Sequence, residues 1–255
     1  MSKTKIEWAD QVWNPVTGCT PISEGCKNCY AARMARRLAG RYGYPKDEPF
    51  KPGTIHEDKF QEPYHWKQPQ KVFVCSMGDL FHNDVPFRVV RDVLFPMFGN
   101  GRRHTYMILT KRPERMLQCL YDNAPDYLPL KNLWLGVTAE NQRTADERIP
   151  ILLQIPAAKR FVSVEPMLEP IKLPNGRCRK CGGMNQKDGL RCEVCGETAL
   201  ADRLDWVIAG PETGPGARPC NIDWVRDLQR QCAAAGVPFF DKKDALGETI
   251  QEWPR

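Results

Sequence analysis

Short apolar runs recur along the chain, and each is followed by a polar or glycine-bearing loop and then by a helical pattern. The runs are rich in β-branched residues and lie at 71–77, 105–110, 133–138, 160–165, 204–210 and 237–240. Runs of this length and composition are typical of buried strands in a parallel sheet. One further strand is expected before Cys19.

Helical patterns lie between the runs, at 112–123, 144–155 and 221–236. In the last of these, Asn221 can cap the start and Gly236 can end the helix. Alternation of strand and helix indicates an α/β fold with a parallel sheet. The number of strands favours a full or partial TIM-type (β/α) barrel, and a doubly wound open sheet is the alternative.

Two stretches break this alternation. Residues 40–70 are polar, aromatic and rich in proline, which predicts a long loop or lid. Residues 174–202 carry a cysteine cluster between two strand candidates. The predicted organisation is therefore a barrel made of 1–173 and 203–255, with a small ribbon inserted at 174–202.

The inserted segment contains two C-x2-C pairs. Two such knuckles supply the tetrahedral four-sulfur shell that Zn²⁺ prefers. The ribbon is either a zinc staple for a segment too small to have its own core, or a small module that grips nucleic acid. The predicted zinc ligands are Cys178, Cys181, Cys192 and Cys195.

Composition is ordinary for a globular protein: 42% of the 255 residues are hydrophobic and 27% are charged. The chain has no apolar run of membrane-spanning length and begins with no signal-peptide pattern, so we expect a cytoplasmic protein with no membrane partner. Disulfides are rare in a reducing cytoplasm, and clustered cysteines there indicate ligands or catalysts. The formal charge of +6 permits an anionic partner, although metal-bound thiolates would reduce it.

A second cysteine group, Cys19, Cys26 and Cys29, lies where the first strand should end and the first helix begin. Three thiolates leave one iron of a 4Fe–4S cluster without a protein ligand. Such an iron can chelate a small molecule, and the cluster can donate an electron to it. The expected position is the rim of a barrel where active sites occur.

The frame N-P-x-x-G-C, G-C-x-x-C-Y-A-x-R around these cysteines resembles the cluster loop of radical S-adenosylmethionine (SAM) enzymes, particularly the spore photoproduct lyase-like branch. The C-x6-C-x2-C spacing is three residues longer than the usual one. The whole chain resembles a phage- and prophage-associated family of radical-SAM-like three-cysteine proteins. The motifs that carry this resemblance are IEWAD, VWNPVTGC, SMGDLFH, ILTKRPER, GVTAENQ, SVEPMLEPI and DWVIAGPETGPGARP.

The resemblance implies roles for residues beyond the cysteines. A glycine/acid motif would hold the amino group of SAM, glycines near the end of the chain would contact its adenine, and residues after the fourth strand candidate would touch its ribose. Two residues that end strand candidates would face the substrate as catalytic groups or form an ion pair at the rim. The glycine/acid motif is Met77, Gly78 and Asp79, and the glycines at the adenine are Gly210 and Gly214. Thr138 and Glu140 are the residues at the ribose, and Lys111 and Glu165 are the two that end strand candidates.

The function expected from the resemblance is reductive cleavage of SAM followed by modification or repair of a nucleic acid or nucleotide. This activity needs an electron donor and is compatible with a protein partner. The alternative is a non-enzymatic zinc-binding protein that recognises nucleic acid. In that case His82 or Cys75 would complete a zinc site with the three cysteines.

Overall fold

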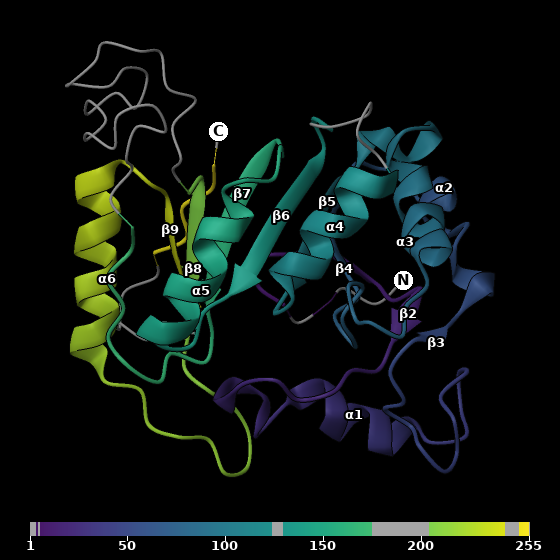
Figure 1. The fold of residues 1–255 in the computed structure, drawn as a ribbon, viewed down its shortest axis with the longest axis horizontal. Coiled ribbons are helices and arrows are strands. Elements are labelled where there is room, and N and C mark those ends of the chain that lie inside the picture. Colours follow the sequence, from purple (N-terminus) through teal and green to yellow (C-terminus); the bar gives the residue numbers. More distant parts are fainter. Residues whose placement is uncertain (1–3, 5, 124–129, 175–203, 243–249, 255) are drawn as a thin grey trace. The chain divides into compact units, whose positions relative to one another are not determined.

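The computed structural model describes residues 4, 6–123, 130–174, 204–242 and 250–254 (Figure 1). The chain divides into two compact units. Unit 1 contains Met1–Val137, Pro156–Ala158 and Thr213–Ala217, and unit 2 contains Thr138–Ile155, Lys159–Glu212 and Arg218–Arg255.

The strands that build unit 1 are parallel and follow the order β1-β4-β5-β6. In this register Trp13 lies beside Val74, and Tyr106 beside Leu133. Four of the six residues of β5 and five of the six of β6 are buried, as expected where helices cover a parallel sheet. The strands are β1 (Gln11–Trp13), β4 (Lys71–Val74), β5 (Thr105–Thr110) and β6 (Leu133–Thr138).

The helices of unit 1 are α1 (Tyr30–Leu38), α2 (Glu62–His65), α3 (Phe87–Leu94) and α4 (Pro113–Asn123). Helices α3 and α4 pack against each other (Figure 1). Short 3-10 helices lie at η1 (Glu24–Cys26), η2 (Glu57–Lys59), η3 (Phe95–Met97) and η4 (Asn100–Arg103). The small antiparallel pair consists of β2 (Val16–Thr17) and β3 (Thr54–Ile55).

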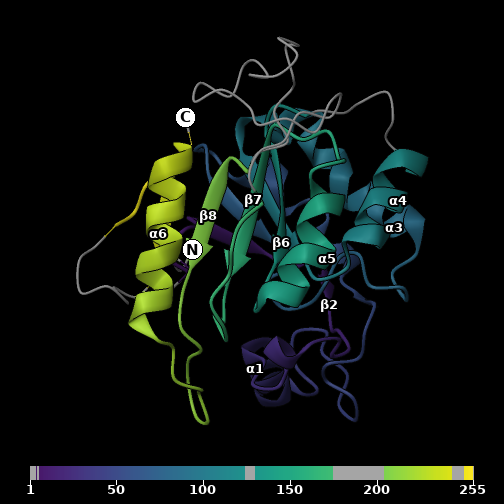
Figure 2. The same ribbon diagram turned by 60° about the vertical axis from the view of Figure 1, so that its left-hand side comes forward.

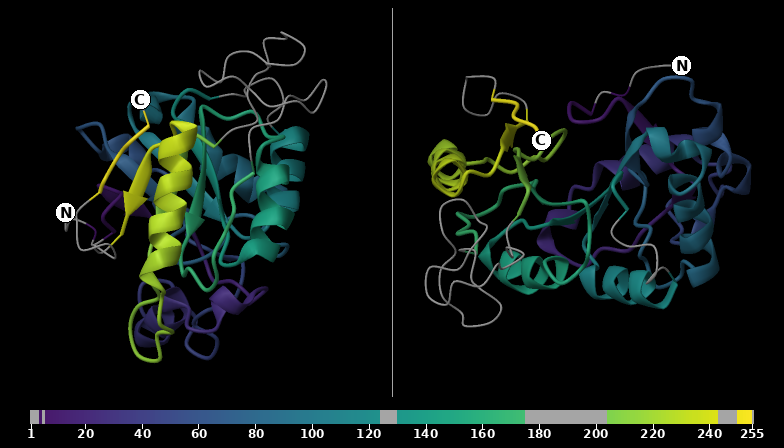
Figure 3. Two further views of the ribbon diagram at one scale, coloured as in Figure 1. Left: turned by 90° about the vertical axis from the view of Figure 1, so that its left-hand side faces the viewer. Right: turned by 90° about the horizontal axis from the view of Figure 1, so that it is seen from above.

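Unit 2 contains three parallel strands in the order β7-β8-β9. Strands β7 and β8 run side by side (Figure 2), and α6 lies along β9 (Figure 3). Its core centres on the fully buried Trp206, whose ring stacks on Trp253 and contacts Phe161 and Phe240. The elements are β7 (Lys159–Val164), β8 (Trp206–Ala209), β9 (Phe239–Asp241), α5 (Gln142–Leu152) and α6 (Ile222–Ala235).

The α/β class with parallel strands is confirmed. The strands at 105–110 and 133–138 have the predicted bounds, and β1 supplies the strand expected before Cys19. Asn221 caps α6 by accepting from Asp223 N–H, and Gly236 ends the helix in a left-handed conformation. The predicted long loop at 40–70 is wrong in part, because β3, η2 and α2 lie within it.

The predicted zinc ribbon and its ligands Cys178, Cys181, Cys192 and Cys195 lie outside the described residues, so the ribbon stays a prediction. Within the described part of the chain, no helix is both long and apolar enough to cross a membrane.

Candidate functional site at the strand ends

The loop that carries the three cysteines leaves the body of unit 1 at Gly18. The N–H of Gly18 donates to the carbonyl of Met77 at 3.0 Å, and Gly18 forms a parallel bridge with Gly78. At Gly18 φ is +85°, and an added Cβ would lie 1.8 Å from the carbonyl oxygen of Lys51. Only glycine fits there, so this position fixes where Cys19 begins the loop.

The three thiols lie on one short stretch of chain. Cys26 ends η1, Cys29 immediately precedes α1, and all three cysteines are half-buried. Across residues 4, 6–123, 130–174, 204–242 and 250–254, no three His, Cys, Asp or Glu side chains are gathered closely enough to hold a metal ion. The fold therefore brings the three sulfurs into one loop without gathering them around one point.

Arg112 connects the cysteine loop to the strands of unit 1. It lies two residues beyond the end of β5, and its Nη1 donates to Cys19 Sγ at 3.2 Å and to Asp79 Oδ2 at 3.0 Å. Its Nη2 donates to the carbonyl and the hydroxyl oxygens of Thr20, both at 3.0 Å. A planar guanidinium with several donors can hold three such partners at once, whereas an ammonium is only a compact charge.

Both carboxylate oxygens of Asp79 are engaged within the chain. The Thr110 hydroxyl donates to Oδ1 at 2.8 Å and to Oδ2 at 2.9 Å, and the N–H of Phe81 donates to Oδ1 at 3.0 Å. Oδ2 also accepts from Arg112 and, at 3.5 Å, from the N–H of Lys111. Asp79 is 5% exposed. An ammonium group from a ligand could reach it only by displacing one of these donors.

His82 extends the same hydrogen-bond network. Its Nδ1 accepts from the N–H of Asp84 at 3.1 Å, so Nε2 carries the hydrogen and donates to the Thr20 hydroxyl at 2.9 Å. Burial, helped by the nearby Arg112 charge, lowers the pKa of His82 and keeps the ring neutral. Cys75, the other proposed fourth zinc ligand, is fully buried, and burial raises the pKa of its thiol to about 12.

The thiols of Cys19 and Cys26 differ in acidity. Burial raises the pKa of Cys19 to about 11, and the Asp79 charge adds to this rise while Arg112 opposes it. Burial also acts to raise the pKa of Cys26, but the Lys111 charge and hydrogen bonds from the preceding turn outweigh it, so this pKa is lowered. The two consecutive cations thus act on different cysteines.

The segment 213–217, which belongs to unit 1, is fastened to the start of α1. Asn28 Nδ2 donates to the carbonyl of Gly216 at 2.8 Å, and the Arg33 guanidinium donates to two carbonyls of the segment at 2.9 and 3.1 Å. Gly214 has φ +92°, and an added Cβ would lie 2.7 Å from Arg33. In this structure Gly214 therefore packs against Arg33.

In unit 2, Glu165 follows β7 and is paired with Lys242, which follows β9. The Nζ–Oε1 distance is 2.6 Å, and the two side chains are 23% and 15% exposed. Gly210 follows β8 between them, and an added Cβ would lie 3.1 Å from Lys242 Cβ and 3.7 Å from Glu165 Cδ. Three neighbouring strands of unit 2 thus end in one compact group.

The other two predicted residues of unit 2 form a buried structural pair with Arg148. Arg148 Nη1 donates to Glu140 Oε2 at 3.0 Å and to the carbonyl of Thr138 at 2.7 Å. The side chains of Glu140 and Arg148 are 1% and 6% exposed. This pair holds Thr138 and Glu140 against α5 within unit 2.

The predicted residues therefore fall into two groups. In unit 1 the structure places Met77, Gly78, Asp79 and Lys111 with the cysteine loop and Gly214 beside α1, and in unit 2 it places Thr138, Glu140, Glu165 and Gly210. The sequence analysis missed Arg112 and Thr110. Their signal is the T-K-R sequence at the end of a predicted strand, where parallel strands present polar groups to a common edge.

Residues 3–252 match the model of one protein family, described as a protein of unknown function, DUF5131. The chain belongs to the DUF5131 family. It matches no curated protein and no solved structure. The matched region covers both units.

Proposed function

We propose that this DUF5131 protein is a radical SAM enzyme, in which Cys19, Cys26 and Cys29 hold a 4Fe–4S cluster and a nucleic acid or nucleotide is modified or repaired. An electron donor, and a protein partner if one is needed, belong to the same proposal. The proposal includes a partial TIM-type barrel of the radical SAM kind as the scaffold.

One observation carries this proposal. A three-cysteine loop leaves the strand ends of unit 1, and the Arg112 guanidinium, anchored on the buried Asp79, donates to Cys19 Sγ at 3.2 Å. A hydrogen-bond donor held against a cysteine sulfur is an outer-shell feature of metal-thiolate sites, where such donors orient the ligand and adjust its electronic properties. A cysteine that served only packing would not need a cation fixed against its sulfur.

The donor set fits a cluster with one open iron. Three thiols are available in one loop, and the two other candidate ligands are engaged elsewhere, since His82 donates to Thr20 and Cys75 is fully buried. When bound, such a cluster supplies the electron for reductive cleavage of SAM. The observations on His82 and Cys75 weigh against a four-ligand zinc site in this loop.

Lys111 and Arg112 have complementary tasks in this proposal. Three thiolates in one loop repel each other, and two cations beside them reduce that repulsion. Lys111 lowers the pKa of Cys26, while Arg112 hydrogen-bonds Cys19. Lys111 therefore favours the thiolate form of Cys26, and Arg112 opposes the rise in the pKa of Cys19 that burial causes.

The predicted role of Asp79 in holding the amino group of SAM is compatible with the geometry only if the ligand replaces a donor already present. The Thr110 hydroxyl is bifurcated between both oxygens of Asp79, so it is the donor most easily given up. Arg112 would remain in place. Asp79 would then hold the cofactor and the cysteine loop together.

Anaerobic purification and reconstitution test the proposal. We expect a brown protein with about four iron and four sulfide ions per chain, whose visible absorbance bleaches on reduction. Cys19→Ala, Cys26→Ala and Cys29→Ala should each lose the iron, while Cys220→Ala, which changes another half-buried thiol, should keep it. With SAM and a reductant, the wild-type protein should form 5′-deoxyadenosine.

A colourless protein whose bound zinc falls when Cys19, Cys26 or Cys29 is changed would support the zinc-binding alternative instead. Zinc that persists in all three variants would belong to the predicted inserted ribbon.

A further inference from the structure

The recess between α2 and η4 is far from the cysteine loop along the strands of unit 1. Helix α2 precedes β4 and η4 precedes β5, so both lie at the amino ends of these parallel strands, whereas the cysteine loop meets the carboxyl ends. The recess has a volume of about 470 Å³ and is lined by Gln61, Tyr64, His65, Arg102 and Arg103.

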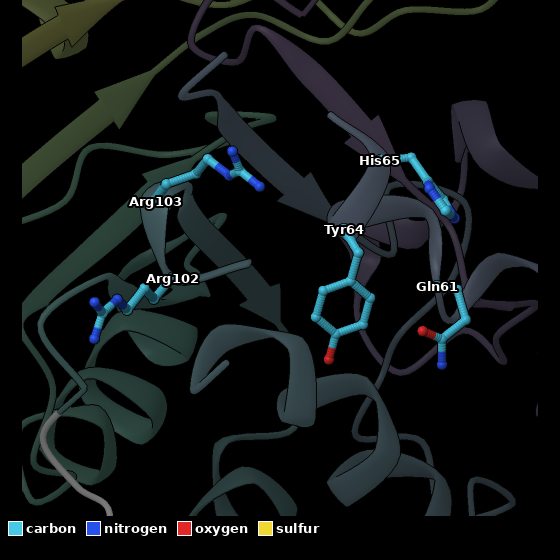
Figure 4. Close-up of a pocket in the computed structure, with 5 residues that line it drawn as sticks. All are labelled: Gln61, Tyr64, His65, Arg102 and Arg103. Carbon is cyan, nitrogen blue, oxygen red and sulfur yellow. The ribbon is translucent and has the colours of Figure 1, made fainter. Parts of the chain in front are cut away.

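The side chains that line the recess are all polar or amphipathic, and none is a carboxylate. Figure 4 shows Tyr64 between the two arginines on one side and Gln61 and His65 on the other. Arg102 and Arg103 are both exposed, and neither has an acidic partner within the described part of the chain. Two adjacent cations without counter-charges attract an anion.

Hydrogen bonds and ring contacts hold the elements around the recess in place. This favours binding, because a site on a flexible loop would bind more weakly by the free energy needed to order the loop. His104 Nε2 donates to the carbonyl of Pro63 at 3.0 Å, and the His104 ring meets Trp66 edge-on. This tautomer follows because a carbonyl can only accept. The carbonyl of Gly101 accepts from Tyr106 at 3.1 Å, so η4 is fastened to β5 as well as to α2.

Gly101 allows η4 to lie this close to its neighbours. An added Cβ would lie 2.5 Å from the carbonyl oxygen of Pro96 and 2.7 Å from the hydroxyl of Tyr106. The two arginines that follow Gly101 are therefore presented from a fixed backbone, which favours a site that is formed before the ligand arrives.

We infer that this recess binds the phosphodiester backbone of a nucleic acid strand, with Arg102 and Arg103 on phosphates and Tyr64, Gln61 and His65 beside the attached nucleosides. Arginine is suited to phosphate, an aromatic ring can stack on any base, and amide and imidazole groups can hydrogen-bond base edges. No large exposed apolar side chain lines the recess, so it lacks the groups that insert into a lipid surface.

This site needs neither the cluster nor SAM, so it stands apart from the proposed enzymatic activity. The probe is a fluorescent single-stranded oligonucleotide of about 20 nucleotides, long enough for several phosphate contacts. Anisotropy titrations at several salt concentrations would compare the wild-type protein with the double variant Arg102→Ala/Arg103→Ala. The metal-free and the reconstituted wild-type proteins, tested beside them, should bind equally well, whatever the outcome for the cluster.

We expect the double variant to bind on the order of tenfold or more weakly, and its slope of log affinity against log salt to be shallower by about 1.4, since each single-strand phosphate contact contributes about 0.7. The matched control is Arg226→Ala/Arg230→Ala, which removes the same charge from two exposed arginines of α6 that are paired with Asp223 and Asp227. This control should leave the slope unchanged.

Equal salt slopes for the wild type and the recess variant would overturn the inference, and so would an equal loss of affinity in the α6 control. Full release of the oligonucleotide by low concentrations of inorganic phosphate would also overturn it, because this would indicate a small-anion site. Loss of binding to phosphatidylserine vesicles without loss of oligonucleotide binding would also overturn it, in favour of a membrane surface. Circular dichroism of both double variants would verify that they fold.

Discussion

Two acid–cation pairs lie at the carboxyl ends of parallel strands, one in each unit, and they differ in what the cation reaches. In unit 1, Arg112 contacts Asp79 and also Cys19. In unit 2, Lys242 contacts Glu165 at 2.6 Å. The first pair is the more buried, with side chains 11% and 7% exposed against 15% and 23%.

An acid at a strand end is therefore not by itself a catalytic or cofactor-binding group. All three carboxylates to which the resemblance gave a role at the cofactor or in the reaction, Asp79, Glu140 and Glu165, are paired with cations of this chain. What distinguishes the unit 1 pair is the third partner, a cysteine sulfur.

The largest effect is expected for Arg112→Ala. It leaves the buried Asp79 carboxylate without its cation, and breaking a buried pair from one side costs about 3–5 kcal/mol. Urea unfolding of the metal-free protein would measure this loss. Iron bound after reconstitution should fall as well, because Cys19 loses the donor that orients it.

Arg112→Lys is the matched control for charge. It keeps the cation but not the planar fork, so it should recover much of the stability and little of the iron binding. Full recovery of both would mean that Arg112 acts only as a charge, and the distinction between the two strand-end pairs would then be lost.

The next effect concerns the glycines beside the two pairs. An added Cβ at Gly78 would lie 2.9 Å from backbone atoms of Gly18 and Thr17, which cannot rotate away as the end of a flexible side chain can. We expect Gly78→Ala to lower the free energy of unfolding by about 1–3 kcal/mol, as overpacking does, and to displace the cysteine loop. Gly210→Ala is the matched variant, since its Cβ would meet Lys242 Cβ at 3.1 Å and should cost less. Thermal unfolding of both variants would show which is less stable. An equal loss of stability in the two variants would contradict this prediction.

A smaller effect is the difference in reactivity between two half-buried thiols. The thiolate is the reactive form, so a thiol with a pKa of about 11 is nearly all protonated at pH 8, whereas a lowered pKa leaves Cys26 partly ionised. In metal-free protein, iodoacetamide should modify Cys26 at least about tenfold faster than Cys19.

The rate at Cys19 should keep rising with pH up to about 11, while that at Cys26 should level off earlier. Peptide mapping by mass spectrometry after timed alkylation gives both rates. Equal rates across this pH range would show that Lys111 and Arg112 do not distinguish the two cysteines.

Much of the fold could be predicted because its signals are local. The strands at 105–110 and 133–138 are continuous apolar runs, and α6 has a capping asparagine and a terminating glycine. By contrast, the short elements within 40–70 have no hydrophobic period. Strand β3 exists because it pairs with β2, and the paired residues lie far apart in the sequence: Val16 is opposite Ile55, 39 residues away, and Thr17 is opposite Thr54, 37 residues away.

The candidate site was predictable only in part, for a related reason. The spacing of the cysteines indicates a cluster loop, and Asp79 and Glu165 are noticed because they follow predicted strands. Their partners depend on which strand ends lie side by side: Arg112 is 33 residues from Asp79, and Lys242 is 77 residues from Glu165. No local pattern indicates such pairings. The sequence alone therefore does not show that Asp79 and Glu165 are paired with cations of the same chain.

The smallest effect is expected for Glu165→Gln. The amide keeps the shape of the side chain and can still accept from Lys242, while the charge attraction is lost. Because both side chains are partly exposed, solvent screens the pair, and the free energy of unfolding should fall by no more than about 1 kcal/mol. Urea unfolding of Glu165→Gln beside Arg112→Ala gives the comparison directly.

If Glu165 also acts on the substrate, turnover should fall far more than stability does, while 5′-deoxyadenosine formation without substrate stays near the wild-type rate. A loss of stability as large as that of Arg112→Ala would instead make the two strand-end pairs equivalent, and the cysteine contact would no longer set unit 1 apart.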